Sequence, residues 1–133
     1  MTAEASTLAI VVPVHDPRER LDALLERLDA VRGAVHQIVI ADDGSPLPTA
    51  LRIADWAATR PTVVVDRVDE SGGVAAARNR AIARVSAEYV WFVDDDDEWD
   101  DAAVPVIALS LRSRPDVLVF RAEYRYHDGR AGR

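Results

Sequence analysis

The amino-acid sequence predicts an α/β fold, a three-layer sandwich in which helices cover both faces of a mainly parallel sheet. Apolar runs of strand length alternate with segments of helical periodicity along the chain. The strand-like runs are apolar at consecutive positions, which is typical of parallel strands buried on both faces. With 133 residues and neither a repeat nor a linker, the chain is expected to form one domain over residues 1–133.

The first strand and the first helix are expected before residue 33. Residues 8–12, Leu-Ala-Ile-Val-Val, form a continuous apolar run that a proline closes. Asp16 and Pro17 are the residue types expected at the N-cap and at the first position of a helix. Leucines then recur at helical spacing, and Gly33 is expected to end the helix.

The second strand and helix follow in the same order. Residues 38–41, Ile-Val-Ile-Ala, are expected to form the strand, and residues 49–59 the helix. Helical spacing places Leu51, Ala54 and Ala58 on one face of this helix. We expect that face to lie against the sheet.

The rest of the chain is expected to supply three strands and two helices. Residues 63–65 are all valine and predict the third strand. A glycine pair opens a helix over 74–85, and an apolar run predicts a fourth strand over 88–94. A helix over 102–113 and a fifth strand over 117–120, Val-Leu-Val-Phe, complete the pattern.

An acidic run directly after the fourth strand is the most unusual feature of the sequence. Seven of its eight residues are acids: Asp94, Asp95, Asp96, Asp97, Glu98, Asp100 and Asp101. The other 16 of the 23 acids balance the 16 basic residues, so the net charge of −7 is local to this run. Clustered carboxylates repel one another and favour a bound cation, and their hard oxygens suit Mg²⁺, Mn²⁺ or Ca²⁺. A solvated acidic loop is the simpler alternative.

Composition excludes several classes of function. The chain has no cysteine, which rules out disulfides and a thiolate nucleophile, and all of its basic residues are arginine, which rules out a P-loop lysine. The arginines are scattered among acids, so a nucleic-acid surface is not expected. No stretch reads as a membrane span or a signal peptide, and a cytoplasmic location is therefore expected.

Four polar segments follow the first four predicted strands. They are residues 13–16, 42–45, 71–73 and 94–101. In an open α/β sheet, ligands bind beyond the carboxyl ends of the strands, near the point where the strand order reverses. The four segments are therefore expected to lie together at one edge of the sheet and to form one site.

These segments resemble those of the family 2 glycosyltransferases, which have the GT-A nucleotide-diphospho-sugar transferase fold. Ile-Val-Val-Pro-Val-His-Asp at 10–16 is similar to the opening strand of the family, with His15 in place of the usual tyrosine. Residues 38–45 resemble its Val-Asp-Asp-Gly-Ser element, and residues 73–79 its Gly-x-x-x-Ala-Arg-Asn segment. Residues 89–99 resemble its Asp-x-Asp metal element, except that the position between the paired acids is itself an aspartate.

The resemblance implies a nucleotide-diphosphate sugar, with a UDP-sugar as the first expectation, and Mn²⁺ or Mg²⁺ as cofactor. The residues implied to bind the nucleotide sugar are Pro13, Val14, His15, Asp42, Asp43, Gly72, Gly73, Arg78, Asp94 and Asp95. The metal is expected to bind Asp94, Asp96 and Asp97.

Within this set, several roles stay open. Asp42 is the expected acceptor for the ring N–H of the base, while Asp43 could instead support the loop. Either residue could simply form an Asx-turn with Gly44. Arg78 could compensate the diphosphate or hold the acidic loop through an ion pair.

The implied activity is sugar transfer, of the inverting type, to an acceptor that the sequence does not identify. The acceptor-binding C-terminal half of the family is expected to be absent, and no general base can be assigned. We therefore expect the chain to bind the donor but to transfer sugar poorly by itself. A non-catalytic nucleotide or divalent-cation binding module is the alternative, and self-association through exposed apolar surface is expected.

Overall fold

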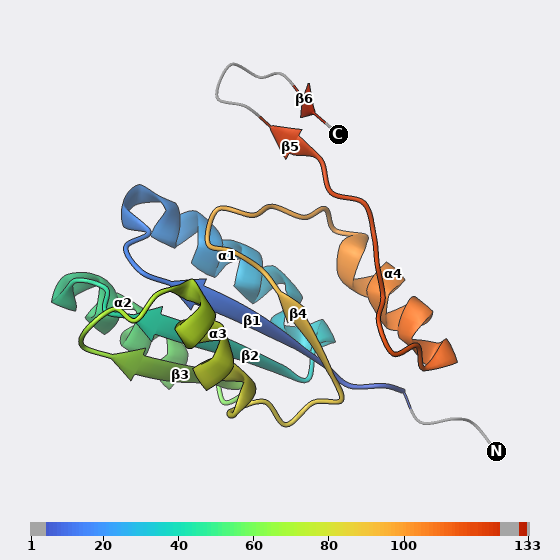
Figure 1. Cartoon of the computed structure of the whole chain (residues 1–133), viewed down its shortest axis with the longest axis horizontal. Coiled ribbons are helices and arrows are strands. Elements are labelled where there is room, and N and C mark those ends of the chain that lie inside the picture. Colours follow the sequence, from blue (N-terminus) through green and yellow to red (C-terminus); the bar gives the residue numbers. More distant parts are fainter. Residues whose placement is uncertain (1–4, 126–130, 133) are drawn as a thin grey trace.

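The computed structural model describes residues 5–125 and 131–132, and its centre is a four-stranded parallel sheet. The strands are β1 (Leu8–Val14), β2 (Gln37–Asp43), β3 (Val63–Val68) and β4 (Tyr89–Phe92). Their order in the sheet is β3-β2-β1-β4 (Figure 1). The chain therefore adds strands on one side of β1 and then crosses to the other side, so the strand order reverses between β1 and β4.

The two central strands owe their place to their apolar sequences. Every residue of β1 and β2 is buried, and the two strands pair in register from Ala9 opposite Gln37 to Val14 opposite Asp42. Strands apolar at consecutive positions lose water from both faces only inside a sheet covered on both sides. The expected mainly parallel sheet is confirmed.

Helices cover both faces of the sheet. They are α1 (Leu21–Val31), α2 (Leu47–Ala58), α3 (Val74–Ile82) and α4 (Ala103–Ser110). Side chains of α1, α2 and α4 pack with alternate residues of β1, among them Ile10 and Val12, in the larger core. Ala77 and Ala81 of α3 pack on the opposite face with Val11, and Figure 1 shows α3 on the near side of the sheet. The three-layer α/β expectation is confirmed.

The predicted fifth strand at 117–120 is wrong. The described chain forms no strand there, and Val117 and Val119 are 74% and 85% exposed. Leu118 packs on the larger core and the Phe120 ring lies edge-on to Trp91 at 5.9 Å. The segment is thus held by two side chains and not by a hydrogen-bonded strand partner. It leads to a short antiparallel pair, β5 (Tyr124–Arg125) and β6 (Ala131–Gly132) (Figure 1).

The start of the first helix also differs from the prediction. Asp16 does not cap it; its carboxylate pairs with Arg18 at 3.2 Å, and the chain enters through a 3-10 turn, Arg18–Arg20. Arg18 has a φ of 51°, a left-handed conformation that turns the chain before the helix begins at Leu21. Single-residue turns of this kind leave little trace in a residue pattern.

The second helix presents a different face from the one expected. Ala50, Ile53 and Trp56 are buried, whereas Leu51 is 60% exposed and Ala54 and Ala58 are exposed. Two faces of this helix are apolar, and the one that carries the larger indole ring buries more apolar area.

The ends of α1 and α2 are joined by a clamp on Asp29. Arg60 donates two hydrogen bonds to the Asp29 carboxylate, at 2.7 and 2.8 Å, and the Trp56 indole N–H donates a third at 3.3 Å. Arg32 adds a contact of 2.8 Å. The bonds from Arg60 above all hold the pKa of Asp29 well below its ordinary value of 3.8.

We expect Asp29→Asn to lower the free energy of unfolding by about 1–2 kcal/mol at pH 7, because the carboxylate is partly exposed and its pairing is partly screened. Because its pKa is lowered on folding, the Asp29 carboxylate stabilises the fold above about pH 4. This contribution is lost as the pH falls through the pKa of the folded state. The difference from wild type should therefore shrink in acid. Asp55→Asn, on the exposed side of α2, is the control. If urea unfolding at pH 7 showed equal decreases in the free energy of unfolding for the two variants, the stabilising role of the Asp29 clamp would be contradicted.

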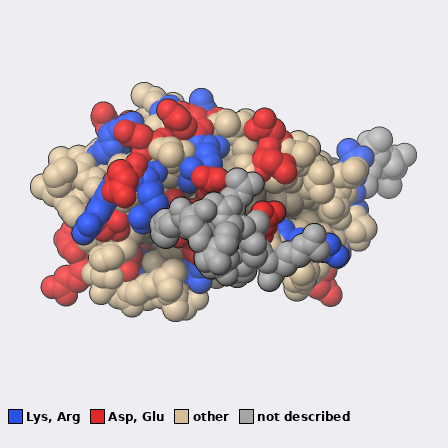
Figure 2. Space-filling view, turned by 90° about the horizontal axis from the view of Figure 1, so that it is seen from above, with Lys and Arg blue, Asp and Glu red and all other residues tan. Residues whose placement is uncertain are grey.

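Within the described residues, none of the helices has both the length and the apolar character needed to cross a bilayer. On the face seen in Figure 2, arginine and acidic side chains lie intermixed.

Candidate functional site

A cavity of about 320 Å³ lies at the point where the strand order reverses. Its walls come from the end of β1, the end of β2, the first turns of α3 and the loop after β4. It is lined by Pro13, Val14, His15, Asp43, Val74, Ala77, Arg78, Asp94, Asp95 and Asp96. This is the position at which open α/β sheets bind ligands, and the volume lies at the lower end of the range of small-molecule sites.

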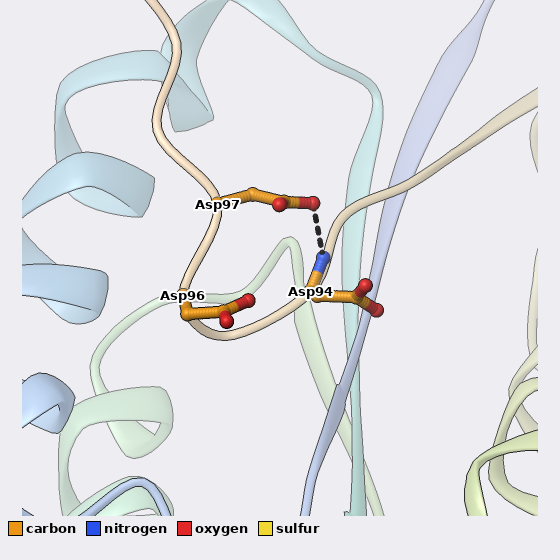
Figure 3. A group of neighbouring side chains, drawn as sticks. All are labelled: Asp94, Asp96 and Asp97. Carbon is orange, nitrogen blue, oxygen red and sulfur yellow. Dashed lines mark hydrogen bonds between the residues drawn. The ribbon is translucent and has the colours of Figure 1, made fainter. Parts of the chain in front are cut away.

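The loop after β4 begins as an ordered acidic turn. Val93 continues the sheet through its N–H, which donates to the Val11 carbonyl at 2.9 Å. Asp94 and Asp97 then bond each other: the Asp94 N–H donates to the Asp97 carboxylate at 2.9 Å, and the Asp97 N–H to the Asp94 carbonyl at 3.1 Å. Figure 3 shows the result, with the three side chains of Asp94, Asp96 and Asp97 on one turn.

These three carboxylates fit a divalent cation. Each offers an oxygen, and the three oxygens lie within 4.8 Å of one another. The ion pairs of this turn also leave room for a cation. Two of its acids are already paired, Asp94 with Arg78 at 2.8 Å and Asp95 with Arg20 at 3.3 Å. Asp96 and Asp97 form no ion pair with the residues that the structure describes. Two uncompensated negative charges on hard oxygen ligands match one Mg²⁺ or Mn²⁺.

Asp95 differs from its neighbours. Its carboxylate is turned to Arg20, and its carbonyl accepts a long hydrogen bond of 3.5 Å from Arg27 on α1. Burial raises the pKa of Asp95, and attraction to Arg20 opposes the rise. The acidic turn is thereby tied to the first helix on one side and to α3 on the other. This arrangement is not that of a free, solvated loop.

Asp100, a later acid of the run, contacts the chain itself. The Asp100 carboxylate accepts the N–H of Ala102 at 2.9 Å, one residue before α4 begins. Trp99 packs edge-on to Trp91 at 5.5 Å and lies under the Arg27 guanidinium. Asp100 therefore belongs to the turn that begins α4 and not to the three-carboxylate group.

Asp42 and Asp43, adjacent at the end of β2, point into different surroundings. The Asp42 side chain is fully buried and its oxygens accept from the Ser45 N–H at 3.0 Å and from Arg67 at 2.8 Å. It does not line the cavity. Arg67 lies directly opposite Asp42 on β3 and also binds the Ser45 carbonyl at 3.1 Å. Asp42 thus closes the turn into α2, but its bond goes to the Ser45 N–H and not to Gly44, the partner of the Asx-turn alternative.

Asp43 lines the cavity and holds the loop before α3. It accepts hydrogen bonds from the Ser71 hydroxyl at 2.6 Å, from the Gly72 and Gly73 N–H groups at 3.0 Å each, and from Arg80 at 3.3 Å. Burial alone would raise the pKa of Asp43, but the bonds from Ser71, the two glycines and Arg80 outweigh it and lower the pKa to about 2. Gly72 and Gly73 therefore serve Asp43, and neither lines the cavity.

His15 lies at the end of β1, on the rim of the same cavity. Its Nδ1 is 2.7 Å from the Asp43 carbonyl oxygen. A carbonyl can only accept, so Nδ1 carries the hydrogen and donates it. In the neutral ring, Nε2 is then left as an acceptor.

Two arginines of the site were not predicted. Arg67 pairs with Asp42, and Arg80 joins Asp43 to Asp66 of β3, which also binds Arg84. Parallel pairing of 63–68 with the end of β2 would have placed Arg67 opposite Asp42, but the predicted third strand ended at residue 65. Nothing in the spacing of Arg80 singled it out from its neighbours.

A second hollow, of about 480 Å³, lies between α1 and α2. It is larger than the first, but it surrounds the Asp29–Arg60 clamp, whose polar groups already satisfy one another. It also lies away from the strand ends. The cavity beside the acidic turn is therefore the better candidate for a ligand site.

Comparison with known proteins identifies the family. A sequence model described as glycosyl transferase family 2 matches residues 9–133. The chain belongs to glycosyl transferase family 2. A dolichol-phosphate mannosyltransferase from Pyrococcus furiosus is 25% identical over 113 residues, which cover 84% of this chain and 32% of that protein. A poly(ribitol-phosphate) beta-glucosyltransferase from Bacillus spizizenii is 32% identical over 94 residues, which cover 68% of this chain and 15% of that protein.

Comparison with solved structures confirms the GT-A fold. S. aureus TarS 1-349 in complex with UDP-GlcNAc superposes with a TM-score of 0.69 at 22% identity, covering 80% of this chain and 31% of that one. The mannosyltransferase PcManGT from Pyrobaculum calidifontis, in complex with GDP-Man and Mn²⁺, gives a TM-score of 0.68 at 21% identity, covering 79% and 32%. This family 2 chain thus spans about a third or less of these relatives.

Proposed function

We propose that the cavity binds the nucleoside diphosphate of a sugar donor, a UDP-sugar in the first instance, together with Mn²⁺ or Mg²⁺. The observation that carries the proposal is the acidic turn, which gathers Asp94, Asp96 and Asp97 beside a cavity at the point where the strand order reverses. Structural relatives that bind UDP-GlcNAc or GDP-Man with Mn²⁺ support it.

The diphosphate is proposed to lie between the acidic turn and α3. A divalent ion held there would supply Lewis-acid chemistry, because its charge would offset the negative charge that develops on the departing nucleotide. Asp94, Asp96 and Asp97 would hold it, and Arg78, on the cavity wall, would donate to phosphate oxygens. Asp95 stays with Arg20 and steadies the turn.

The nucleoside is proposed to lie over the end of β1. Pro13 and Val14 offer an apolar surface there, and His15 offers Nε2 as an acceptor for a ring N–H. This replaces Asp42 as the proposed acceptor, because the Asp42 carboxylate is buried and already bonded to Ser45 and Arg67. Asp43 acts indirectly, by fixing the loop that begins α3.

The reaction proposed for the complete site is inverting. An acceptor hydroxyl attacks the anomeric carbon, the bond from that carbon to the phosphate oxygen breaks, the nucleoside diphosphate leaves, and a base takes the hydroxyl proton. No described side chain is assigned as that base. We therefore propose that the 133-residue chain binds the donor but turns it over slowly, and robust acceptor-dependent transfer would refute this part.

Calorimetric titration with UDP, in Mn²⁺ and separately in EDTA, tests the proposal. We expect binding in Mn²⁺ and at least about 10-fold weaker binding in EDTA or in Asp96→Asn, because the positive charge that would attract the diphosphate is removed or held less tightly. Glu98→Gln is the matched control, since Glu98 is an exposed acid of the same run. Mn²⁺ binding without any effect of UDP would favour a divalent-cation module instead.

A further inference from the structure

Arg78 contacts the acidic turn and also lines the cavity in which the diphosphate is proposed to lie. Its guanidinium donates to Asp94 at 2.8 Å, lies 5.8 Å from the centre of the Phe92 ring, and lines the cavity. Its Nε is buried and has no hydrogen-bond partner among the described residues. Buried N–H groups are rarely left unpaired, so this one indicates that a further acceptor belongs near the guanidinium.

We propose that Arg78 is an internal counter-ion that occupies Asp94 until a divalent cation replaces it. The inference rests on the proposed function, and it adds a competition between Arg78 and the cation for one carboxylate. The guanidinium that leaves Asp94 is then free to bind the diphosphate. Arg78 thereby opposes metal binding in the absence of nucleotide and supports it in the presence of nucleotide.

Electrostatics gives the sign of the first effect. Asp94 supplies one oxygen of the three-carboxylate group, and Arg78 already neutralises that residue. A cation at this group must take Asp94 from Arg78 and remain close to the positive guanidinium, and both effects weaken its binding. Both groups are partly exposed, at 37% for Arg78 and 49% for Asp94, so solvent moderates the competition.

The second effect follows from what the guanidinium can reach. Arg78 lies in the cavity wall, and its planar fork matches phosphate oxygens as well as carboxylate oxygens. A diphosphate that accepts from Arg78 removes the competitor from Asp94. Because coupling between two ligands is reciprocal, nucleotide should raise the affinity for metal by the same factor that metal raises the affinity for nucleotide.

The test is titration of the protein with Mn²⁺ alone, with free Mn²⁺ measured by its electron paramagnetic resonance signal. Arg78→Gln removes the competing charge, and we expect it to bind Mn²⁺ about 3- to 10-fold more tightly than wild type. Arg78→Lys keeps the charge and should stay within about twofold of wild type. Arg84→Gln is the matched control in the turn that follows α3, where Arg84 pairs with Asp66, and it should leave the affinity unchanged.

A second titration, with saturating UDP, measures the coupling. UDP should raise the Mn²⁺ affinity of wild type, and by a smaller factor in Arg78→Gln. Equal or weaker Mn²⁺ binding by Arg78→Gln without UDP would overturn the inference while leaving the proposed metal site intact. Failure of wild type and variant alike to bind Mn²⁺ would overturn both. Tighter binding without UDP and reduced coupling with it would establish the competition.

Discussion

Gly44→Ala is expected to destabilise the protein by at least about 2 kcal/mol and to disturb the cavity. Gly44 has a φ of 76°, a backbone angle that residues other than glycine rarely adopt. A Cβ atom there would also lie 2.8 Å from the backbone N of Ser71 and 3.2 Å from the carbonyl O of Asp69. These are backbone atoms of the loop that Asp43 holds, so the loop itself must move.

Gly33→Ala is the control for this change. No heavy atom lies within 4 Å of the position that its Cβ would take, and its φ is not in the left-handed region. Urea unfolding should show little change for Gly33→Ala, or a gain of up to about 1 kcal/mol. A stability equal to that of wild type for Gly44→Ala would contradict the close approach of the β2–α2 turn to the loop at residues 69–71.

Asp43→Asn is expected to lower the free energy of unfolding by about 2–4 kcal/mol at pH 7. The side chain is 4% exposed and accepts from four donors, and the new amide would turn a donor toward some of them. Arg80 would lose its buried partner. The loop that opens α3 should loosen, which faster amide exchange at Ser71 to Gly73 would report.

The difference in free energy of unfolding between wild type and Asp43→Asn should also depend on pH. The pKa of Asp43 falls from an ordinary 3.8 to about 2 in the folded protein, so its carboxylate stabilises the fold fully above the ordinary value. That contribution is lost as the pH falls toward 2, and the difference between wild type and Asp43→Asn should shrink there. Asp69→Asn is the control, because the Asp69 side chain is 96% exposed. Similar losses for Asp43→Asn and Asp69→Asn at pH 7 would contradict the assigned role.

The sequence predicted the elements that depend on local pattern and burial. Residues 8–12 and 38–41 are apolar without a break, and a parallel sheet is the arrangement in which such strands are buried on both faces. The same apolar pattern could not predict whether residues 117–120 pair with the sheet, because pairing depends on where the chain lies after it leaves α4. The choice between the Leu51 face and the Trp56 face of α2 likewise depends on the neighbouring layer.

The sequence predicted which residues lie together at this edge of the sheet more fully than it predicted the contacts of each one. The acidic turn brings together Asp94, Asp96 and Asp97, the group expected to bind metal, because adjacent residues on one tight turn remain close in any fold. Asp42 and Asp43 could not be told apart, since their environments come from Arg67 and Arg80 on other elements. Long-range pairs of this kind have no fixed spacing in the sequence.

A crystal grown with Mn²⁺ and UDP, in which anomalous scattering locates the metal, would test directly whether the acidic turn holds the cation. We expect one strong anomalous peak bounded by the carboxylates of Asp94, Asp96 and Asp97 and by diphosphate oxygens, with the Arg78 guanidinium moved from Asp94 to the phosphate. A peak elsewhere, or carboxylates that turn to bulk solvent while UDP occupies the cavity, would contradict the central claim that the acidic turn holds the cation for the nucleotide.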